Sequence, residues 1–260
     1  MSRDILQIEN LRIYFPAESG TNRVVDGLNL TVSESEILAL VGGSGCGKTI
    51  TGLTILRLQP PQATIAGGKI FWQGKDIFEL SENQMRTIRG KEISMVFQEP
   101  LTSLNPLFTI GFQIAEVLKL HTEIKQNYKS RTIELFRQVG ISQAEKIIDD
   151  YPHQLSGGLR QRVMIAQAIA ASPKLIIADE PTSNLDVTLQ AQILELFKEL
   201  KQRLNLSILL ITHDIAVVSE LADRVAIIHD GKIVEEGNPK NIISNPTDSY
   251  TKKLIEAVGV

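Results

Sequence analysis

The sequence predicts an α/β fold with a mainly parallel central sheet. Apolar runs of strand length alternate with helical patterns between residues 175 and 229. A glycine-rich loop stands between a short apolar strand and a helix near residue 45. Strands that alternate with helices form largely parallel sheets whose two faces are both covered.

The first hundred residues are expected to hold five strands and one helix. Strands are predicted over residues 5–15, 24–32 and 37–41, and a helix runs from 48 to about 58. We expect Pro60-Pro61 to end this helix, because proline has no N–H to donate and clashes with the preceding turn. Gly67-Gly68 is expected to lead into a strand over 69–72, and another strand covers 93–97.

The middle of the chain, at about residues 104–162, reads as a helical insertion. Residues 111–120 and 131–139 have helical spacing and few β-branched runs. The α/β alternation then returns, with strands over 175–179, 207–212 and 224–229 and helices over 188–204 and 215–222. Asp230-Gly231 is expected to turn the chain into a last strand over 232–236.

Composition excludes several classes of function. Positive and negative residues nearly balance, with a formal net charge of −3, which gives no support to a nucleic-acid-binding face. No apolar stretch approaches the roughly 20 residues that span a bilayer, and the N-terminal residues lack the apolar core of a secretion signal. We therefore expect any membrane role to act through a partner. The single cysteine, Cys46, fits a reducing cytoplasm and argues against a cysteine-based zinc site.

A phosphate-binding loop is the clearest motif. The pattern G-x-x-x-x-G-K-[ST] is matched in full by Gly42, Gly43, Ser44, Gly45, Cys46, Gly47, Lys48 and Thr49. Its glycines let backbone N–H groups curl around a phosphate at a helix N-terminus. Lys48 is expected to reach the β- and γ-phosphates of ATP, and the Thr49 hydroxyl to ligate Mg²⁺. An ordinary glycine-rich turn is disfavoured because eight positions and both flanking elements agree.

Cys46 allows two interpretations. A small side chain can simply fill a serine-sized space. A thiol near a helix N-terminus can also have a lowered pKa, in which case alkylating reagents would inhibit and bound ATP would protect.

Two acids, Asp179 and Glu180, end an apolar strand. Ligands of α/β sheets bind at the carboxyl ends of such strands. Asp179 suits Mg²⁺, directly or through water, and Glu180 suits general-base or water-orienting work on the attacking water. A solvated strand end is the alternative, and the phosphate loop weighs against it.

Further motifs carry a family resemblance. Residues 155–162, Leu-Ser-Gly-Gly-Leu-Arg-Gln-Arg, resemble the signature motif of ABC ATPases. Gln98 is similar to the Q-loop glutamine, residues 183–186 (Ser-Asn-Leu-Asp) to the D-loop, and His213 to the switch histidine. The order and spacing of the motifs agree over essentially the whole chain.

The resemblance implies a P-loop NTPase fold in a single domain over 1–260. That fold has a mainly parallel central sheet, an antiparallel β subdomain, the helical insertion and a short C-terminal segment over 237–260. It further implies that two such subunits sandwich two ATP molecules. Each ATP lies between the phosphate loop of one subunit and Ser156, Gly157 and Gly158 of the other.

The same resemblance assigns roles to single residues. Gln98 contacts Mg²⁺ and water, His213 holds the γ-phosphate near Glu180, and Asp186 of the D-loop counts among the ATP-binding residues. An aromatic residue at the end of the first strand stacks on adenine. Phe15 is the expected residue and Tyr14 the rival, since the register is uncertain by one.

Two segments point to a branch of the family. Residues 98–106 and 245–254 resemble stretches of dipeptide, oligopeptide and nickel importers. Many peptide-importer ATPases continue into a cysteine-containing extension that this chain lacks, which shifts weight modestly towards nickel or metal-chelate importers. The implied partners are a second ATPase chain, the same or related, two membrane-spanning permease subunits and, indirectly, an extracytoplasmic binding protein. The implied place is the cytoplasmic face of the membrane.

The sequence disfavours two other functions. ABC ATPases that act on ribosomes usually carry two such domains in one chain, whereas this chain carries one. Those that act on DNA insert long coiled coils, and this sequence has no sustained heptad pattern. An exporter ATPase is disfavoured by residues 104–106 and the terminal segment. The cargo itself stays open, because the partners choose it.

Overall fold

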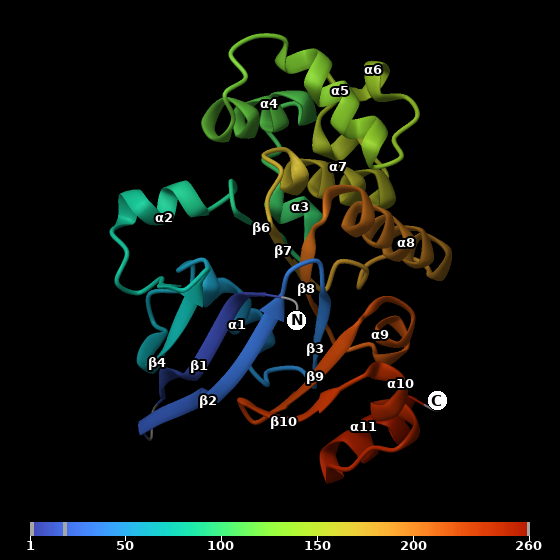
Figure 1. Cartoon of the computed structure of the whole chain (residues 1–260). Coiled ribbons are helices and arrows are strands. Elements are labelled where there is room, and N and C mark those ends of the chain that lie inside the picture. Colours follow the sequence, from blue (N-terminus) through green and yellow to red (C-terminus); the bar gives the residue numbers. More distant parts are fainter. Residues whose placement is uncertain (1–2, 18–19, 259–260) are drawn as a thin grey trace. The chain divides into compact units, whose positions relative to one another are not determined.

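The computed structural model describes residues 3–17 and 20–258, which pack into two compact units (Figure 1). The first unit contains the chain up to Met85 and from Asn205 onward, and the second contains Arg86–Leu204. Among the described residues, no helix combines the length and the apolar character needed to cross a membrane.

One layer of the first unit is an antiparallel sheet. It consists of β1 (Asp4–Ala17), β2 (Gly20–Ser33), β4 (Thr64–Trp72) and β5 (Lys75–Asp76) in the order β2-β1-β4-β5. Alternate side chains such as Ile13, Leu28 and Ile70 have no exposed surface. The antiparallel β subdomain implied by the resemblance is therefore present.

The prediction that Gly67-Gly68 precedes a strand is wrong, because β4 begins at Thr64 and both glycines lie inside it. Gly68 has a φ of +88°, and a Cβ there would lie 2.4 Å from the carbonyl oxygen of Asn10. The register of β1 on β4 shifts at this point. Glycine is needed here because the two backbones approach closely at a bulge.

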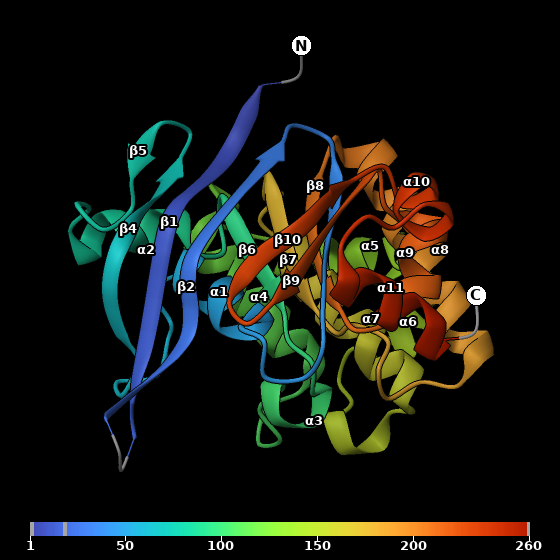
Figure 2. The ribbon, with the colours of Figure 1, turned by 90° about the horizontal axis from the view of Figure 1, so that it is seen from below.

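The other sheet strands of the first unit surround β3. β3 (Ile37–Val41) lies parallel to β8 (Ser207–Thr212) and to β9 (Arg224–His229), while β10 (Lys232–Gly237) pairs antiparallel with β9. All residues of β3 and β8 are buried. Helices α10 (Pro239–Ser244) and α11 (Ser249–Val258) pack on this β9–β10 hairpin (Figure 2).

Helix α1 (Lys48–Ile55) ends before the position that the sequence predicts, and for a different reason. Arg57 has a φ of +53°, the Leu58 N–H donates to the Leu53 carbonyl at 2.9 Å, and the Arg57 N–H donates to the Thr54 carbonyl at 2.9 Å. These two bonds form a Schellman cap. The Arg57 side chain donates to the Leu80 carbonyl at 2.6 Å, which helps to hold a non-glycine residue in the left-handed region. The helix therefore stops ahead of Pro60.

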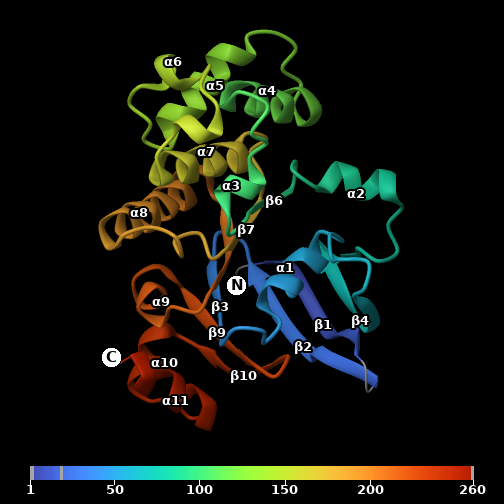
Figure 3. The same cartoon turned by 180° about the vertical axis from the view of Figure 1, so that it is seen from behind.

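The chain enters the second unit within α2 (Glu82–Ile88) and then forms β6 (Ile93–Val96), which pairs parallel with β7 (Leu175–Asp179). Between these strands the chain is helical. The helices are α3 (Pro100–Ser103), α4 (Ile110–His121), α5 (Tyr128–Gln138), α6 (Ala144–Ile147), a 3₁₀ turn (Pro152–Gln154) and α7 (Gly157–Ile169). Helix α7 packs against α3, α4, α5 and β6 (Figure 3), and α8 (Val187–Leu204) completes the unit.

Candidate functional site

The predicted site residues divide between the two units, and the residues of each unit are described separately. The phosphate loop, Phe15 and His213 belong to the first unit. Gln98, the carboxylates Asp179 and Glu180, the signature residues and Asp186 belong to the second.

The phosphate loop joins β3 to α1 in a conformation that requires its glycines. Gly45 and Gly47 have φ values of +78° and +105°. A Cβ on Gly42 would lie 2.3 Å from the carbonyl oxygen of Ile228 on β9. The loop is thus pressed against a neighbouring strand and curled by left-handed residues, which directs backbone N–H groups inward.

Lys48 is held across its own loop. The side chain is only 6% exposed, and its Nζ donates to the carbonyl oxygens of Gly42 at 2.8 Å and Gly43 at 2.9 Å. The Sγ of Cys46 lies 3.9 Å from the same nitrogen. Burial raises the pKa of the Cys46 thiol, although the charge of Lys48 acts in the opposite direction. A raised pKa means less thiolate at neutral pH, so the structure favours Cys46 as a small space-filling side chain.

A hollow of about 490 Å³ lies beside the loop. Its lining includes Lys48 and Thr49 from α1, Phe15 from β1 and Pro60. Tyr14 is engaged elsewhere, since its hydroxyl donates to Asp26 Oδ1 at 3.0 Å and the guanidinium of Arg23 lies 5.5 Å from its ring centroid. The structure thus distinguishes the two aromatic residues, because Phe15 lines the hollow whereas Tyr14 packs on β2.

His213 follows the last residue of β8 directly. Its side chain is exposed, and the next residue, Asp214, donates its N–H to Thr212 Oγ1 at 3.0 Å. This turn places the imidazole at the carboxyl end of a buried parallel strand, where ligands of α/β sheets bind.

The carboxylates of the second unit stand in different environments. Asp179 ends β7 and is 3% exposed, whereas Glu180 is half-buried with a φ of +43°. A left-handed conformation costs a glutamate free energy, and such strain concentrates at functional sites. Gln98 donates from Nε2 to Glu180 Oε2 at 3.1 Å. The structure therefore joins the Q-loop residue to the expected base.

Three predicted motifs of the second unit meet around a hollow of about 330 Å³. Its lining includes Gln98 and Glu99 from the Q-loop, Gly157 from the signature, and Ser183 and Asn184 from the D-loop. Asn184 Nδ2 donates to Glu99 Oε1 at 3.0 Å, which ties the D-loop to the Q-loop directly.

The signature motif opens helix α7. Ser156 is its N-cap, and the hydroxyl accepts from the Leu159 N–H at 3.4 Å. Gly157 is exposed, so its N–H can be approached from outside. Gly158 is buried, and a Cβ there would lie 3.2 Å from the methyl groups of Leu189. The first glycine thus leaves access to the helix N-terminus, and the second permits close packing on α8.

Asp186 has a structural function that the sequence reading did not assign. Its Oδ1 accepts from the Leu189 N–H at 3.0 Å and its carbonyl accepts from the Gln190 N–H at 2.9 Å, so it caps α8. The D-loop therefore ends where α8 begins.

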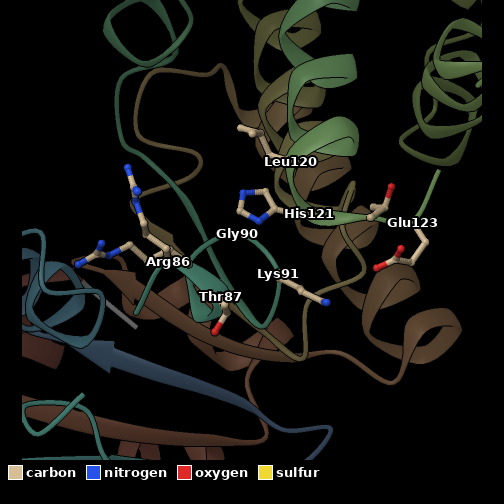
Figure 4. A pocket seen from close by; sticks show the side chains of 9 residues that line it. Arg86, Thr87, Gly90, Lys91, Leu120, His121 and Glu123 are labelled. Atoms are coloured by element: carbon tan, nitrogen blue, oxygen red, sulfur yellow. The ribbon is translucent and has the colours of Figure 1, made fainter. Parts of the chain in front are cut away.

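A third hollow, of about 730 Å³, is lined by residues that no predicted motif contains. Figure 4 shows the His121 imidazole at the end of α4 directed towards the turn at Gly90, with Arg86 and Lys91 nearby and Glu123 beyond. A Cβ on Gly90 would lie 2.9 Å from His121 Nε2. Burial and the charge of Lys91 lower the pKa of His121.

Comparison with known proteins agrees with this geometry. The family model described as ABC transporter matches residues 25–183. The oligopeptide transport ATP-binding protein AppD of Bacillus subtilis (strain 168) is 49% identical over 98% of this chain and 79% of its own length. The dipeptide transport ATP-binding protein DppD of the same organism is 44% identical over 98% and 76%.

A solved structure supports the same assignment. The ATP-binding cassette MJ0796, in a dimeric post-hydrolysis state bound to ADP and Pi, superposes with a TM-score of 0.80 and 26% identity, over 90% of this chain and 98% of that one. Family model, relatives and fold agree. The chain belongs to the ABC transporter family and is one of its ATP-binding, ATP-hydrolysing subunits.

Proposed function

We propose that the chain drives the import of peptides across the cytoplasmic membrane. The observation that carries this proposal is the similarity, over nearly the whole chain, to relatives named for oligopeptide and dipeptide transport. This similarity outweighs the nickel or metal-chelate alternative.

On the first unit, the phosphate loop is proposed to bind the triphosphate of ATP through its backbone N–H groups. Lys48 would exchange the carbonyls of Gly42 and Gly43 for phosphate oxygens, which are stronger acceptors because they are charged. Phe15 would stack on adenine, as supported by its place in the hollow that Lys48 and Thr49 also line. His213 would donate to the γ-phosphate.

On the second unit, Glu180 is proposed to orient and deprotonate the attacking water. Its hydrogen bond from Gln98 supports this role, because the bond holds the carboxylate in a fixed orientation. The signature residues Ser156, Gly157 and Gly158 would contact the γ-phosphate bound by a partner subunit, as supported by the exposed start of α7.

Magnesium fits the donors that the motifs provide. On the first unit Thr49 offers a hydroxyl, and on the second unit Asp179 offers a carboxylate and Gln98 an amide oxygen. Each is a hard oxygen ligand of the kind Mg²⁺ prefers. Within the described ranges, no group of three or more His, Cys, Asp or Glu side chains could hold a metal ion. Bound Mg²⁺ would neutralise charge that develops on the phosphates.

The partner surface is proposed to lie on the second unit. Among the exposed large apolar side chains of this unit, four lie between residues 101 and 112: Leu101 (53%), Leu107 (78%), Phe108 (44%) and Phe112 (51%). The rings of Phe108 and Phe112 stack at 4.8 Å between centroids. An exposed apolar cluster of this kind suits an amphipathic helix, and we propose that a permease subunit supplies it at the cytoplasmic face of the membrane.

The test uses the complete transporter, reconstituted in lipid with its second ATPase subunit, its permeases and its binding protein. ATP hydrolysis is compared with a mixed peptide pool, with Ni²⁺ plus a small chelator, and with neither. Stimulation by peptides supports the proposal. Stimulation by the metal alone would overturn the peptide assignment in favour of a metal importer.

A further inference from the structure

A tyrosine near the C-terminus contacts the phosphate loop. Tyr250 lies in the first turn of α11, within the segment that resembles peptide and nickel importers. Its hydroxyl accepts from the backbone N–H of Gly43 at 2.8 Å. Its ring stacks on His229, the last residue of β9, with centroids 3.7 Å apart and an interplanar angle of 11°. Ring and hydroxyl are thus both engaged.

The start of α11 is fastened to the sheet by one carboxylate. Glu235 of β10 accepts from the N–H and the hydroxyl of Thr247 through Oε1, at 2.9 and 2.8 Å, and from the Asp248 N–H through Oε2 at 3.1 Å. Asp248 in turn accepts the Tyr250 N–H at 2.7 Å. These bonds outweigh burial and lower the pKa of Glu235, so the carboxylate that holds the segment is ionised at neutral pH.

Gly43 connects this segment to Lys48. The N–H of Gly43 donates to Tyr250, and the carbonyl of the same residue accepts from Lys48 Nζ. A Cβ at Gly43 would lie 3.1 Å from the tyrosine hydroxyl, so the loop and the tyrosine are in direct contact. Because Gly43 has no side chain to restrict it, a hydrogen bond to a rigid partner is an effective way to fix its backbone.

We propose that Tyr250 is a positioning residue for the phosphate loop, and that through it α11 sets the affinity of the subunit for nucleoside triphosphates. The hydroxyl fixes Gly43, and Gly43 in turn presents the carbonyl that holds Lys48. The proposal rests on the proposed function of the loop as the triphosphate site. It adds a residue of the C-terminal helix to the groups that determine nucleotide binding.

The test compares Tyr250→Phe with the wild type in the full chain. The phenylalanine keeps the ring against His229 and removes only the hydroxyl. Tyr128→Phe is the matched control, because its hydroxyl also makes one 2.8 Å hydrogen bond to the backbone, to the Ile124 carbonyl in the second unit. Four quantities are measured: the exchange rate of the Gly43 amide hydrogen by NMR, the Kd of fluorescent MgATP, and kcat and KM for ATP hydrolysis.

For Tyr250→Phe we expect faster exchange at Gly43 and a Kd and KM for ATP raised roughly three- to tenfold, as for the loss of one hydrogen bond. We expect kcat to stay within about twofold, because no reacting group changes. Tyr128→Phe should leave all four quantities unchanged. An unchanged Kd would overturn the proposal, whether or not the Gly43 amide exchanges faster.

Two safeguards keep the outcome decisive. If Tyr250→Phe does not fold, Glu235→Gln tests the same connection by loosening the start of α11, and an unchanged Kd in that variant would also overturn the proposal. If the wild type itself does not bind ATP, the proposed function fails. The Gly43 exchange rate still decides whether Tyr250 holds the loop.

Discussion

Replacing Glu180 with glutamine tests the hydrolytic site most directly. The substitution removes the carboxylate and leaves the surrounding contacts almost unchanged. Gln98 Nε2 donates to Glu180 Oε2 at 3.1 Å, and the side-chain oxygen of a glutamine at 180 can accept the same bond. The left-handed backbone at this position, with a φ of +43°, costs either side chain about the same. The variant should therefore keep the fold and the Q-loop contact.

The expected loss follows from the role of the carboxylate. A positioned general base contributes about 10²–10⁴ in rate, so kcat for Glu180→Gln should fall by at least about 10². That corresponds to about 2.7 kcal/mol or more of activation free energy. The Kd for ATP should stay within about twofold, because the lost group acts on water rather than on the bound nucleotide.

The assay measures phosphate release at saturating MgATP, together with ATP binding by fluorescence. Glu134→Gln is the control for a loss of charge, since Glu134 lies exposed on α5 and pairs only with Arg131 among the ion pairs of the described chain. Turnover by Glu180→Gln within about threefold of the wild type would refute the role of Glu180 as base.

Three further predictions address binding, packing and pH. Phe15→Ala should raise the Kd for ATP by about tenfold or more, as for the loss of base stacking, whereas Tyr14→Ala should change it less than about twofold. Equal effects of the two variants in an ATP titration would reopen the choice between Phe15 and Tyr14. Phe136→Ala on α5, whose ring is fully buried, should lower the free energy of unfolding by about 3–5 kcal/mol in a urea titration, and a loss below about 1 kcal/mol would contradict the packing described. Burial and the charge of Lys91 lower the pKa of His121 from 6.5, so the folded protein favours the neutral imidazole. The free energy of unfolding should therefore fall as the pH drops below 6.5. His121→Asn should reduce this pH dependence in thermal unfolding between pH 7 and 5.

The strands that the sequence predicts best are those buried on both faces. β3, β7, β8 and β9 have the predicted bounds, because each is a short run of apolar residues closed by a turn residue or a charge. The short helices α2, α3, α6 and α10 were not predicted. With four to seven residues each, they are too short to show an apolar period, and tertiary contacts rather than propensity stabilise them.

Local patterns also misplace the ends of elements when the cause lies elsewhere in the chain. Pro60-Pro61 reads as the end of α1, yet a left-handed Arg57 tied to the Leu80 carbonyl ends it earlier. Gly67-Gly68 reads as a break, yet Gly68 permits close approach to Asn10 of β1. Both causes involve a partner more than twenty residues away, which no window along the sequence contains.

For the candidate site, too, the sequence predicts some features and not others. The phosphate loop, Gln98, Glu180 and the signature were predicted as site residues from motifs, because each chemistry needs fixed residue types at a fixed spacing. Their hydrogen bonds were not predicted. That Gln98 would bond to Glu180, that Asp186 would cap α8, and that Phe15 rather than Tyr14 would line the hollow all depend on tertiary structure.

The contacts of Lys48 explain how its ammonium group can be buried and still be able to bind a phosphate. At 6% exposure, an unpaired charge would be costly, and the carbonyls of Gly42 and Gly43 offset that cost without neutralising the charge. They are neutral acceptors, so the charged oxygens of a phosphate can displace them with stronger bonds. An acidic partner in their place would hold the lysine too tightly to release it. A weakly paired lysine therefore suits the proposed role of the loop, and in our proposal the hydrogen bond from Gly43 to Tyr250 holds the Gly43 carbonyl in place for this pairing.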